Sequence, residues 1–585
     1  MTDRELLFYD IECFRYDSLV IFKNIYNKVV RYWWNAQMPE DLPSEDLSNG
    51  FDGLKDFVTD KILVGYNNYN YDDIMLSEMM NNRPQKYIYA MNNTIIRGGS
   101  QGFKPDPVIH SLDCFQQIDV SNPSLKRIEG NMGRSIIESS VDFTIQRPLT
   151  EQEREEVFKY CAYDIQNTIE IYKLRTHSYF EPKQELLGMV DTTSKTAYRW
   201  NTTTLSAQAL MDKPQPRWDK LKIPAHLWRN ATLGIDNDVW DMWSKADAES
   251  LVKDVRQTKI CLSHPVEFTF SFGGLHGVAV DGKRFKNVKL LDVGSMYPTI
   301  IIYLQALGDA TDKYNGIRKH RLEIKHTDKV LSDALKLILN SVYGNLKNQY
   351  SLLYNPKASA TVCIYGQIAL FDLCRRLDAA GYQVVNANTD GVAFCGVGTG
   401  YEEIWHQWEK DYAPMMLELD TFDTWIQKDV NNYIATKGEK IKVKGGDTNK
   451  YLQDQYFKNN SLRIVQMAMV DKLLYDTDPI VTVSKYVDHP EYYQIILQAG
   501  RTYQGVYDMA GNKYQNVNRV FACKPEYAEP RLFKKRLDGG LVNFPRLPEH
   551  MMVWNADTSE FKDFAQKVDL KYYKNEVYEK LKGWM

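Results

Sequence analysis

Four acidic residues in the first 165 positions are spaced so that they could share metal ions. Asp10 and Glu12 lie two apart in a predicted strand, which puts both side chains on one face. Asp72 follows a second predicted strand, and Tyr160 and Asp164, four apart on a predicted helix, also share a face. Gathered carboxylates repel one another, and oxygen-liganded divalent cations relieve that repulsion. Two such ions can activate a water, which Tyr160 could orient, to hydrolyse a phosphodiester. Solvated surface acids are the alternative interpretation for each pair taken alone.

A second group of acids lies between residues 288 and 391. Asp292 ends the apolar run 288–291, where its carboxylate and the main-chain carbonyl of Val293 could hold a metal. Asp390 lies at the tip of a predicted hairpin, although an Asp-Gly pair alone is usually only a turn. Together Asp292 and Asp390 predict a shared metal site.

A basic helix lies between these two acids. Lys336, Asn340 and Tyr343 occupy positions i, i+4 and i+7, so they face one ligand. A lysine can bind a triphosphate as a point charge, and a tyrosine one turn later can pack on a base. Arg321 lies upstream in a segment, residues 313–347, that carries eight basic and three acidic residues. An amphipathic helix with solvated lysines is the alternative interpretation.

Several elements must position these residues. Alternating apolar residues predict strands at residues 6–12, 18–23, 28–34, 61–66 and 288–292. Thr150 and Glu153 have the spacing of a capping box, which predicts a helix to about residue 174. Residues 328–342 predict a long helix, and residues 383–394 and 432–444 predict hairpins. After residue 450 only a mixed α+β region is predicted.

Composition excludes several classes of protein. The 585 residues are 44% hydrophobic and 25% charged, which is ordinary for a globular chain and excludes disordered, collagenous and coiled-coil proteins. The mean hydropathy of -0.46 and the lack of a long apolar run predict no membrane span, and no signal segment is recognised. Eight scattered cysteines without a C-x-x-C pair favour a reducing, cytoplasmic compartment. The net charge of -4 hides basic segments that could bind phosphates.

In chain order, the motifs resemble those of family B DNA polymerases, over residues 10 to about 446. Three segments resemble the exonuclease motifs of the family's proofreading domain: Asp10-Ile11-Glu12, Asn68-x-x-Tyr71-Asp72 and Tyr160-x-x-x-Asp164. Three further segments resemble the polymerase motifs. Motif A corresponds to Asp292-Val293-Gly294-Ser295-Met296-Tyr297-Pro298, motif B to Lys336-x-x-x-Asn340-Ser341-x-Tyr343-Gly344, and motif C to Asn388-Thr389-Asp390-Gly391. The resemblance implies a multidomain α/β and α+β fold, with an RNase H-like exonuclease followed by a right-hand polymerase.

The resemblance also implies roles for individual residues. Two Mg²⁺ (or Mn²⁺) ions per active site would be held by Asp292, Val293 and Asp390, and by Asp10, Glu12, Asp72 and Asp164, with Tyr160 as a further catalytic residue. Nucleotide binding would use Arg321, Lys336, Asn340, Tyr343, Tyr297 and Ser295. DNA binding would use Asn68 (or Asn67), Tyr71, Gly273, Gly274, Tyr433, Lys442 and Lys444. For the Gly273-Gly274 pair, a plain turn is the alternative.

The chain departs from the family pattern at several points. Motif C usually has two acids, and Asn388 replaces the first, which predicts an altered metal preference. The family's Lys-x-Tyr, which contacts the primer, has Asn431 in place of its lysine, and the following Lys442 and Lys444 could supply that charge. A lysine found before Arg-Pro in small phage members has no counterpart, since Ile145 lies there. Only 44 residues separate Asp292 from Lys336, so the insertion of protein-primed members is missing and a nucleic-acid primer is expected.

We therefore interpret the chain as a phage- or plasmid-encoded DNA-directed DNA polymerase of replication, with 3'-5' proofreading. The expected regions are 1–180 exonuclease, 181–298 linker and first part of the palm, 299–358 fingers, 359–450 second part of the palm, and 451–585 thumb. Expected partners are primer–template DNA and dNTPs, with a primase, helicase or single-strand-binding protein as candidates. We expect a monomer in the cytoplasm, that of the host for a phage protein. The alternatives are an exonuclease with a non-catalytic polymerase-like DNA clamp, and a non-enzymatic replication factor.

Overall fold

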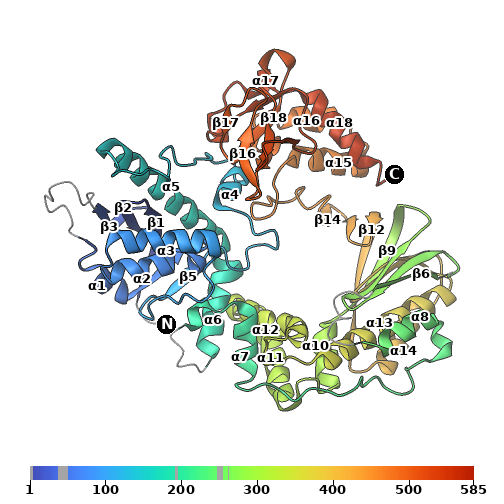
Figure 1. Ribbon diagram of the computed structural model, residues 1–585. Helices are drawn as coiled ribbons and strands as arrows, with labels where there is room; N and C mark the ends of the chain where they lie inside the picture. Colours follow the sequence, from blue (N-terminus) through green and yellow to red (C-terminus); the bar gives the residue numbers. More distant parts are fainter. Residues whose placement is uncertain (1–3, 37–49, 191–195, 247–254, 261) are drawn as a thin grey trace. The chain divides into compact units, whose positions relative to one another are not determined.

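The structure is a computed structural model that describes residues 4–36, 50–190, 196–246, 255–260 and 262–585 (Figure 1). Contacts divide the chain into two units. The first contains residues 1–201, 455–463 and 484–573, and the second contains residues 202–454, 464–483 and 574–585. The fold is thus mixed α/β and multidomain. The finer boundaries expected at 180, 298, 358 and 450 stay predictions.

The first unit begins with a five-stranded sheet in the order β3-β2-β1-β4-β5. Its strands are β1 (Glu5–Cys13), β2 (Asp17–Lys23), β3 (Val29–Ala36), β4 (Lys61–Gly65) and β5 (Ser111–Asp113). β1 lies at the centre, antiparallel to β2 and parallel to β4. The strands predicted from the alternating pattern are confirmed within two residues at each end.

Helices cover both faces of this sheet (Figure 1). They are α1 (Leu54–Thr59), α2 (Asp72–Met80), α3 (Gln85–Gly98), α4 (Leu125–Asn131), α5 (Glu151–Arg175) and α6 (Glu181–Met189). Leu7 and Tyr9 pack into the core under α1, α2 and α3, whereas Phe8 packs into the core under α4 and α5. Because strand side chains alternate, Asp10 and Glu12 follow Phe8 onto the face that α5 covers.

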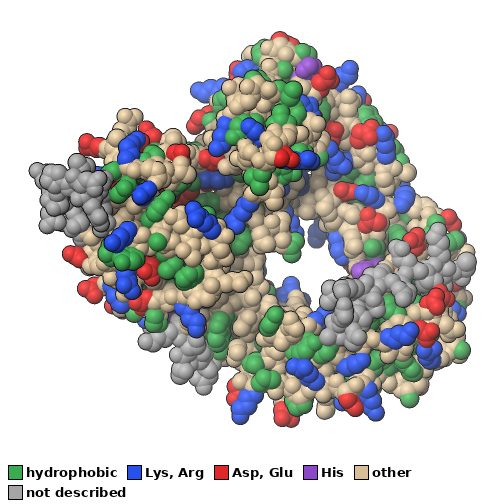
Figure 2. Space-filling view, viewed as in Figure 1, with side chains coloured by type: hydrophobic (Ala, Val, Ile, Leu, Met, Phe, Trp, Pro, Cys, Tyr) green, Lys and Arg blue, Asp and Glu red, His purple; other side chains and the backbone are tan. Residues whose placement is uncertain are grey.

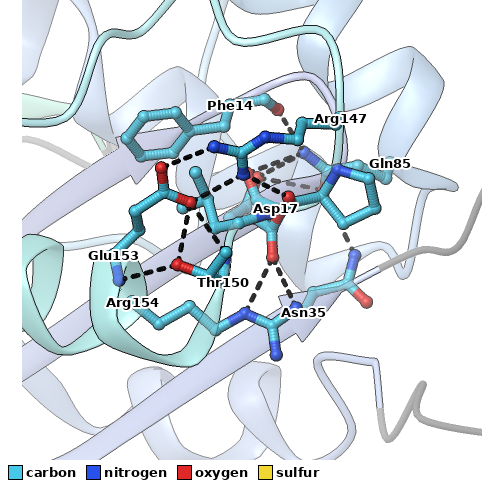
Figure 3. A network of polar contacts seen from close by, with 11 residues as sticks. Phe14, Asp17, Asn35, Gln85, Arg147, Thr150, Glu153 and Arg154 are labelled. Atoms are coloured by element: carbon cyan, nitrogen blue, oxygen red, sulfur yellow. Dashed lines mark hydrogen bonds and ion pairs between the residues drawn. The ribbon is translucent and has the colours of Figure 1, made fainter.

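The N-terminus of α5 is fixed by a polar network (Figure 3). Thr150 and Glu153 form the predicted capping box, and Arg147 donates to both carboxylate oxygens of Glu153 at 2.7 Å. Arg154 donates at 3.0 Å to Asp17, whose side chain is buried at the start of β2. The network joins α5 to the sheet and so sets the height at which the later residues of α5 face β1.

Two smaller sheets complete the first unit, in the orders β15-β18-β21 and β17-β16-β19-β20. The strands are β15 (Ile495–Gln498), β16 (Tyr503–Tyr507), β17 (Lys513–Tyr514), β18 (Val517–Ala522), β19 (Phe533–Arg536), β20 (Leu541–Asn543) and β21 (Met551–Val553), and helix α17 is Phe564–Lys567. Arg519 of β18 is fully buried and donates to the main-chain carbonyls of Gly130 at 3.2 Å and Arg134 at 2.6 Å. Part of the predicted thumb region therefore packs on the segment around α4.

The second unit is built on a sheet with the order β14-β13-β12-β9-β11-β10-β8-β7-β6. The strands are β6 (Val255–Ile260), β7 (Val266–Ser271), β8 (Gly274–Ala279), β9 (Arg284–Val293), β10 (Gln383–Asn388), β11 (Gly391–Cys395), β12 (Leu417–Asp429), β13 (Asn432–Lys437) and β14 (Lys440–Lys444). β9 lies between β11 and β12 and is antiparallel to both. The predicted strand and both predicted hairpins are confirmed.

The helices of the second unit pack on this sheet or on one another. They are α7 (Thr202–Leu210), α8 (Asn237–Ser244), α10 (Met296–Tyr303), α11 (Thr311–Ile324), α12 (Lys329–Lys347), α13 (Pro356–Ala379), α14 (Tyr401–Asp411), α15 (Arg463–Tyr475), α16 (Pro479–Lys485) and α18 (Leu570–Leu581). The largely buried helix α13 contacts β8, β10 and β11, and α12 packs against α7, α11 and α13. The predicted long helix is confirmed; it is capped by Asp328 and ends five residues later than expected, at Lys347.

The surface carries charges of both signs. Figure 2 shows Lys and Arg side chains interspersed with Asp and Glu over the visible face. Among the described residues, no helix is long and apolar enough to cross a membrane.

Replacing Thr150 by alanine removes the side-chain acceptor of the α5 capping box. We expect the free energy of unfolding of the first unit to fall by about 1 kcal/mol, measured by urea denaturation. Thr144→Ala is the matched control, because Thr144 also makes a local side-chain bond, to exposed Asp142, but caps no helix. An equal loss in both variants would contradict the capping role.

Candidate functional site

The first candidate site lies where β1 faces α5. Ligand atoms of Asp10, Glu12 and Cys161 lie within 4.8 Å of one another. The Cys161 thiol donates to the main-chain carbonyl of Asp10 at 3.6 Å, so α5 packs closely on β1 here. One turn of α5 around Cys161 also brings Tyr160 and Asp164 to this face, and the Tyr160 side chain acts to lower the pKa of the Asp164 carboxyl, against the larger raising effect of burial.

The four acids of this site oppose one another electrostatically. Burial, followed by the Asp164 charge, raises the pKa of Asp10 to about 8. Burial and the Asp10 charge also raise the pKa of Glu12 and of Asp72 well above their ordinary values. Asp72 is the first residue of α2, where the helix amides partly offset its charge. These carboxylates resist ionisation because they are buried and repel one another, and a bound divalent cation would relieve that repulsion. Their oxygen atoms are the ligands that hard divalent cations prefer.

Lys126 is a member of this site that the sequence motifs did not indicate. From α4 its ammonium group forms an ion pair with Asp164, and it lies 4.6 Å from the centre of the Tyr160 ring. Burial acts to lower the Lys126 pKa, but the carboxylates of Asp164 and Glu129 outweigh it and raise the pKa. Ile145 occupies the position at which small phage members of the family have a lysine. In this chain a lysine reaches the acids from α4 instead.

Glu129 lies behind Lys126, at i+3 on the same helix. Its side chain is fully buried, accepts from Lys126 at 3.3 Å and accepts from Asn167 of α5 at 2.9 Å. Burial raises the Glu129 pKa to about 8. The Lys-x-x-Glu spacing was a visible signal, but such pairs are common on solvated helices, and only the packing of α4 buries this one.

The second candidate site lies at adjacent strand ends in the second unit. Asp292 of β9 pairs in register with Gly391 of β11 on one side and with Glu418 of β12 on the other. The Val293 amide donates to the Asp390 carbonyl at 2.7 Å, which ties the hairpin tip to β9. Desolvation, then the Asp390 charge, raises the pKa of Asp292 to about 6, and Glu418 adds to this. Glu418 is thus a third acid, recognisable only from the strand register.

Gly391 is required by the close approach of the Asp292 carboxylate. A Cβ atom on Gly391 would lie 2.7 Å from Asp292 Oδ1. Any larger residue at position 391 would displace the Asp292 carboxylate. The glycine of motif C therefore has a steric role beside its role in the turn.

A cavity of about 240 Å³ opens beside the second acidic cluster. Its lining residues are Ser295, Met296, Tyr297, Pro298, Leu339, Asn340, Tyr343, Thr389 and Asp390. The structure thus brings residues of motifs A, B and C to one cavity. Lys336 is exposed one turn before Asn340 on α12, and neither Lys336 nor Arg321 contributes to the cavity lining.

Two tyrosines form a wall of this cavity. The rings of Tyr297 and Tyr343 lie 4.4 Å apart, centre to centre. The Tyr297 hydroxyl donates to the Gly273 carbonyl at 3.1 Å, and the Tyr343 hydroxyl donates to the Phe272 carbonyl at 2.7 Å. Phe272 and Gly273 form the turn of the β7–β8 hairpin, and Gly274 begins β8. The plain-turn alternative therefore fits Gly273, and the DNA-contacting role expected of the glycine pair stays a prediction.

The basic hairpin β13–β14 faces the same acids. Lys444 pairs with Tyr433 in register and lowers the Asp390 pKa, against the larger raising effect of burial. Lys442 similarly lowers the Asp292 pKa. Tyr433 is buried and stacked on Trp425 at 4.1 Å, so its ring is part of the core.

The remaining predicted DNA contacts differ in accessibility. Asn68 is fully buried and donates to Asp73 at 3.1 Å, whereas Asn67 is partly exposed in a left-handed conformation. Tyr71 is partly buried, and its hydroxyl donates to Asn92 at 2.7 Å. Of the two asparagines weighed, Asn67 is therefore the one whose side chain can be reached from solvent.

Similarity to known proteins is found in structure and not in sequence. No model of a protein family matches the chain, and no curated protein matches it. The chain is similar to a solved family B DNA polymerase from the hyperthermophilic archaeon Pyrobaculum calidifontis, with 13% sequence identity and a TM-score of 0.44, over 100% of this chain and 78% of that one. At that level of similarity, function must be inferred from the residues of the two sites.

The raised pKa values predict how metal and pH act together. Asp10 protonates near pH 8 in the folded protein and near pH 4 when unfolded, so metal-free protein should lose stability as pH rises between these values. Mg²⁺ should therefore raise the unfolding temperature by about 2 to 4 °C at pH 8 and have little effect at pH 5, because protons compete with it. Differential scanning fluorimetry with and without Mg²⁺ measures both.

The variant Asp10→Asn with Glu12→Gln is the control for that experiment. It keeps the shape of the side chains but removes two of the buried charges. Its metal-free unfolding temperature should depend less on pH than that of the wild type. An unchanged pH profile would show that these acids are not the groups that titrate.

Proposed function

We propose that the chain is a DNA-directed DNA polymerase that extends a primer with dNTPs and has a 3'-5' proofreading exonuclease. The proposal is supported above all by one observation: residues of three separated motifs, Ser295 and Tyr297, Asn340 and Tyr343, and Asp390, line one cavity beside paired acids. In the other unit, Asp10 and Glu12 lie together, and Asp10 interacts electrostatically with Asp164 and Asp72, which supports the exonuclease part of the proposal.

At the polymerase site, Asp292, Asp390 and the Val293 carbonyl would hold the divalent ions, with Glu418 adjacent. Bound there, Mg²⁺ supplies charge stabilisation at the transferred phosphate and lowers the pKa of the primer 3'-hydroxyl. The chain's own residues position the reactants. Asn340 and Tyr343 of α12 bound the space for the incoming base pair.

Tyr297 would discriminate between sugars. Its ring is held by the Tyr343 ring and by the hydrogen bond to the Gly273 carbonyl, so it cannot easily move aside. A rigid ring beneath the sugar would exclude a 2'-hydroxyl. Lys336 and Arg321, exposed or partly exposed on α12 and α11, would bind the triphosphate from outside the cavity lining.

At the exonuclease site, Asp10, Glu12, Asp72 and Asp164 would hold the ions. Tyr160, one turn from Asp164 on α5, would orient the attacking water. Asn67 and Tyr71 would contact the single-stranded primer end, and Lys442 and Lys444 would contact the duplex backbone near the other site. The missing insertion between Asp292 and Lys336 supports a nucleic-acid primer.

A 5'-labelled primer–template with Mg²⁺ tests both activities. We expect extension when dNTPs are present and shortening when they are absent. Asp292→Asn should slow extension at least about 10³-fold and leave shortening intact, because it removes a metal ligand at one site only. Asp10→Ala with Glu12→Ala should do the reverse.

The other outcomes of this assay are equally informative. Shortening without any extension by the wild type would support the alternative of an exonuclease with a DNA clamp. Neither activity would support a non-enzymatic replication factor. Shortening that survives the loss of Asp10 and Glu12 would overturn the assignment of the nuclease site.

Lys126→Met should slow primer shortening about 10- to 100-fold and leave extension unchanged. Lys126 pairs with Asp164 and lies over Tyr160, so its loss should disturb the geometry of that ligand and of the water it orients. Lys159→Met is the matched control, since Lys159 is an exposed lysine of α5 that forms an i,i+4 ion pair with Glu155. Equal rates for wild type and Lys126→Met would exclude a positioning role.

A further inference from the structure

Asn388 and Asn431, where the chain departs from the family B pattern, contact each other. Asn388 ends β10, and its Nδ2 atom donates to Asn431 Oδ1 at 3.2 Å. The two departures therefore belong to one structural feature.

An amide is required at position 388 by its surroundings. Asn388 Nδ2 also donates to the main-chain carbonyl of Val430 at 3.1 Å, and Asn388 Oδ1 accepts from Thr389 at 3.2 Å. A carbonyl oxygen can only accept a hydrogen bond, so the atom facing Val430 must be a nitrogen. An aspartate would place a carboxylate oxygen against the Val430 carbonyl and Asn431 Oδ1, which are both acceptors. Each lost hydrogen bond or repulsive contact of this kind lowers the stability of the fold.

The bond joins β10 to the turn between β12 and β13, although β10 and β12 are not neighbours in the sheet. β11 and β9 lie between β10 and β12 in the strand order. Side chains make the connection instead: besides Asn388, Asn386 donates to Gln427 at 3.2 Å, and Gln427 donates to the Val385 carbonyl at 3.0 Å. The turn between β12 and β13 is thereby held against β10.

The connection lies two residues from functional candidates on both sides. Asp390 follows Asn388, and Tyr433, with Lys444 paired to it, follows Asn431. Moving one turn relative to the other would move the acid relative to the basic hairpin β13–β14. The side-chain pair thus determines how the hairpin tip and the basic hairpin β13–β14 face each other.

We propose that Asn388 and Asn431 form an uncharged positioning pair that holds Asp390 in place relative to Tyr433 and Lys444, and that each amide requires the other. This inference rests on the proposed polymerase function. In it, Asn388 acts as a positioning residue, because its nitrogen donates to Val430 and Asn431 and its oxygen accepts from Thr389. The charge at the site is left to Asp292, Asp390 and Glu418, with Lys442 and Lys444 as the cations.

The pair is tested by changing it to an acid and a lysine, singly and together. Asn388→Asp should raise the KM for the primer–template about tenfold and lower kcat less, because the carboxylate repels the Val430 carbonyl and loosens the turn. Adding Asn431→Lys should return the KM to within about threefold of the wild type, since the ammonium can pair with the new carboxylate. Additive effects of the two changes would overturn the proposal.

A charge control separates pairing from a general increase in positive charge. Asn388→Asp combined with Gln407→Lys places the lysine on exposed α14, where it should not restore the KM. Equal rescue by Gln407→Lys would also overturn the proposal.

A second measurement does not depend on polymerase activity. Asn388→Ala, Asn431→Ala and the double variant should lower the unfolding temperature non-additively, with the double variant little worse than Asn388→Ala alone, because Asn388 also bonds Val430 and Thr389. If the wild type fails to extend primers, the proposed function fails, and this thermal cycle alone decides whether the amides are coupled. Additive shifts in unfolding temperature would then refute the pair.

Discussion

Repulsion among gathered carboxylates is the constraint on which both candidate sites depend. In the first unit, four acids lie in the protein interior, where the charged form is disfavoured, and the pKa of Asp10 rises to about 8. The cluster is tolerable because Lys126 already contributes a positive charge and because α2 begins at Asp72. The remaining negative charge makes this a site that gains free energy when it binds divalent cations.

The two acidic clusters are assembled by different kinds of packing. In the first cluster a strand meets a helix: β1 supplies Asp10 and Glu12, and α5 supplies Asp164. The N-terminus of α5 is held against the sheet by the ion pair between Arg154 and Asp17. In the second, neighbouring antiparallel strands present their acids in register, with Gly391 leaving room for the Asp292 carboxylate. The first cluster is therefore sensitive to helix position, and the second to strand register.

Lysine side chains are placed differently at the two acidic clusters. Lys126 is buried and fixed between Asp164 and Glu129, so its charge belongs to the interior of the site. Lys442 and Lys444 extend from an edge hairpin, where the same charge remains available to a polyanion. A polymerase with two opposed activities would need both arrangements: a fixed cation where a strand end is hydrolysed, and accessible cations where a duplex is held.

The sequence by itself determined the elements and the residue types of both sites. Period-two strands, the Thr150 capping box and the i, i+4, i+7 pattern of α12 are local, because they depend on neighbours within one or two turns, and each was predictable. What only the tertiary structure decided was how distant segments meet. Lys126 and Glu418 join the acids through helix packing and strand register, and Asn388 meets Asn431 across two intervening strands. No local pattern encodes such contacts, because they arise from the burial of side chains that are far apart in the chain.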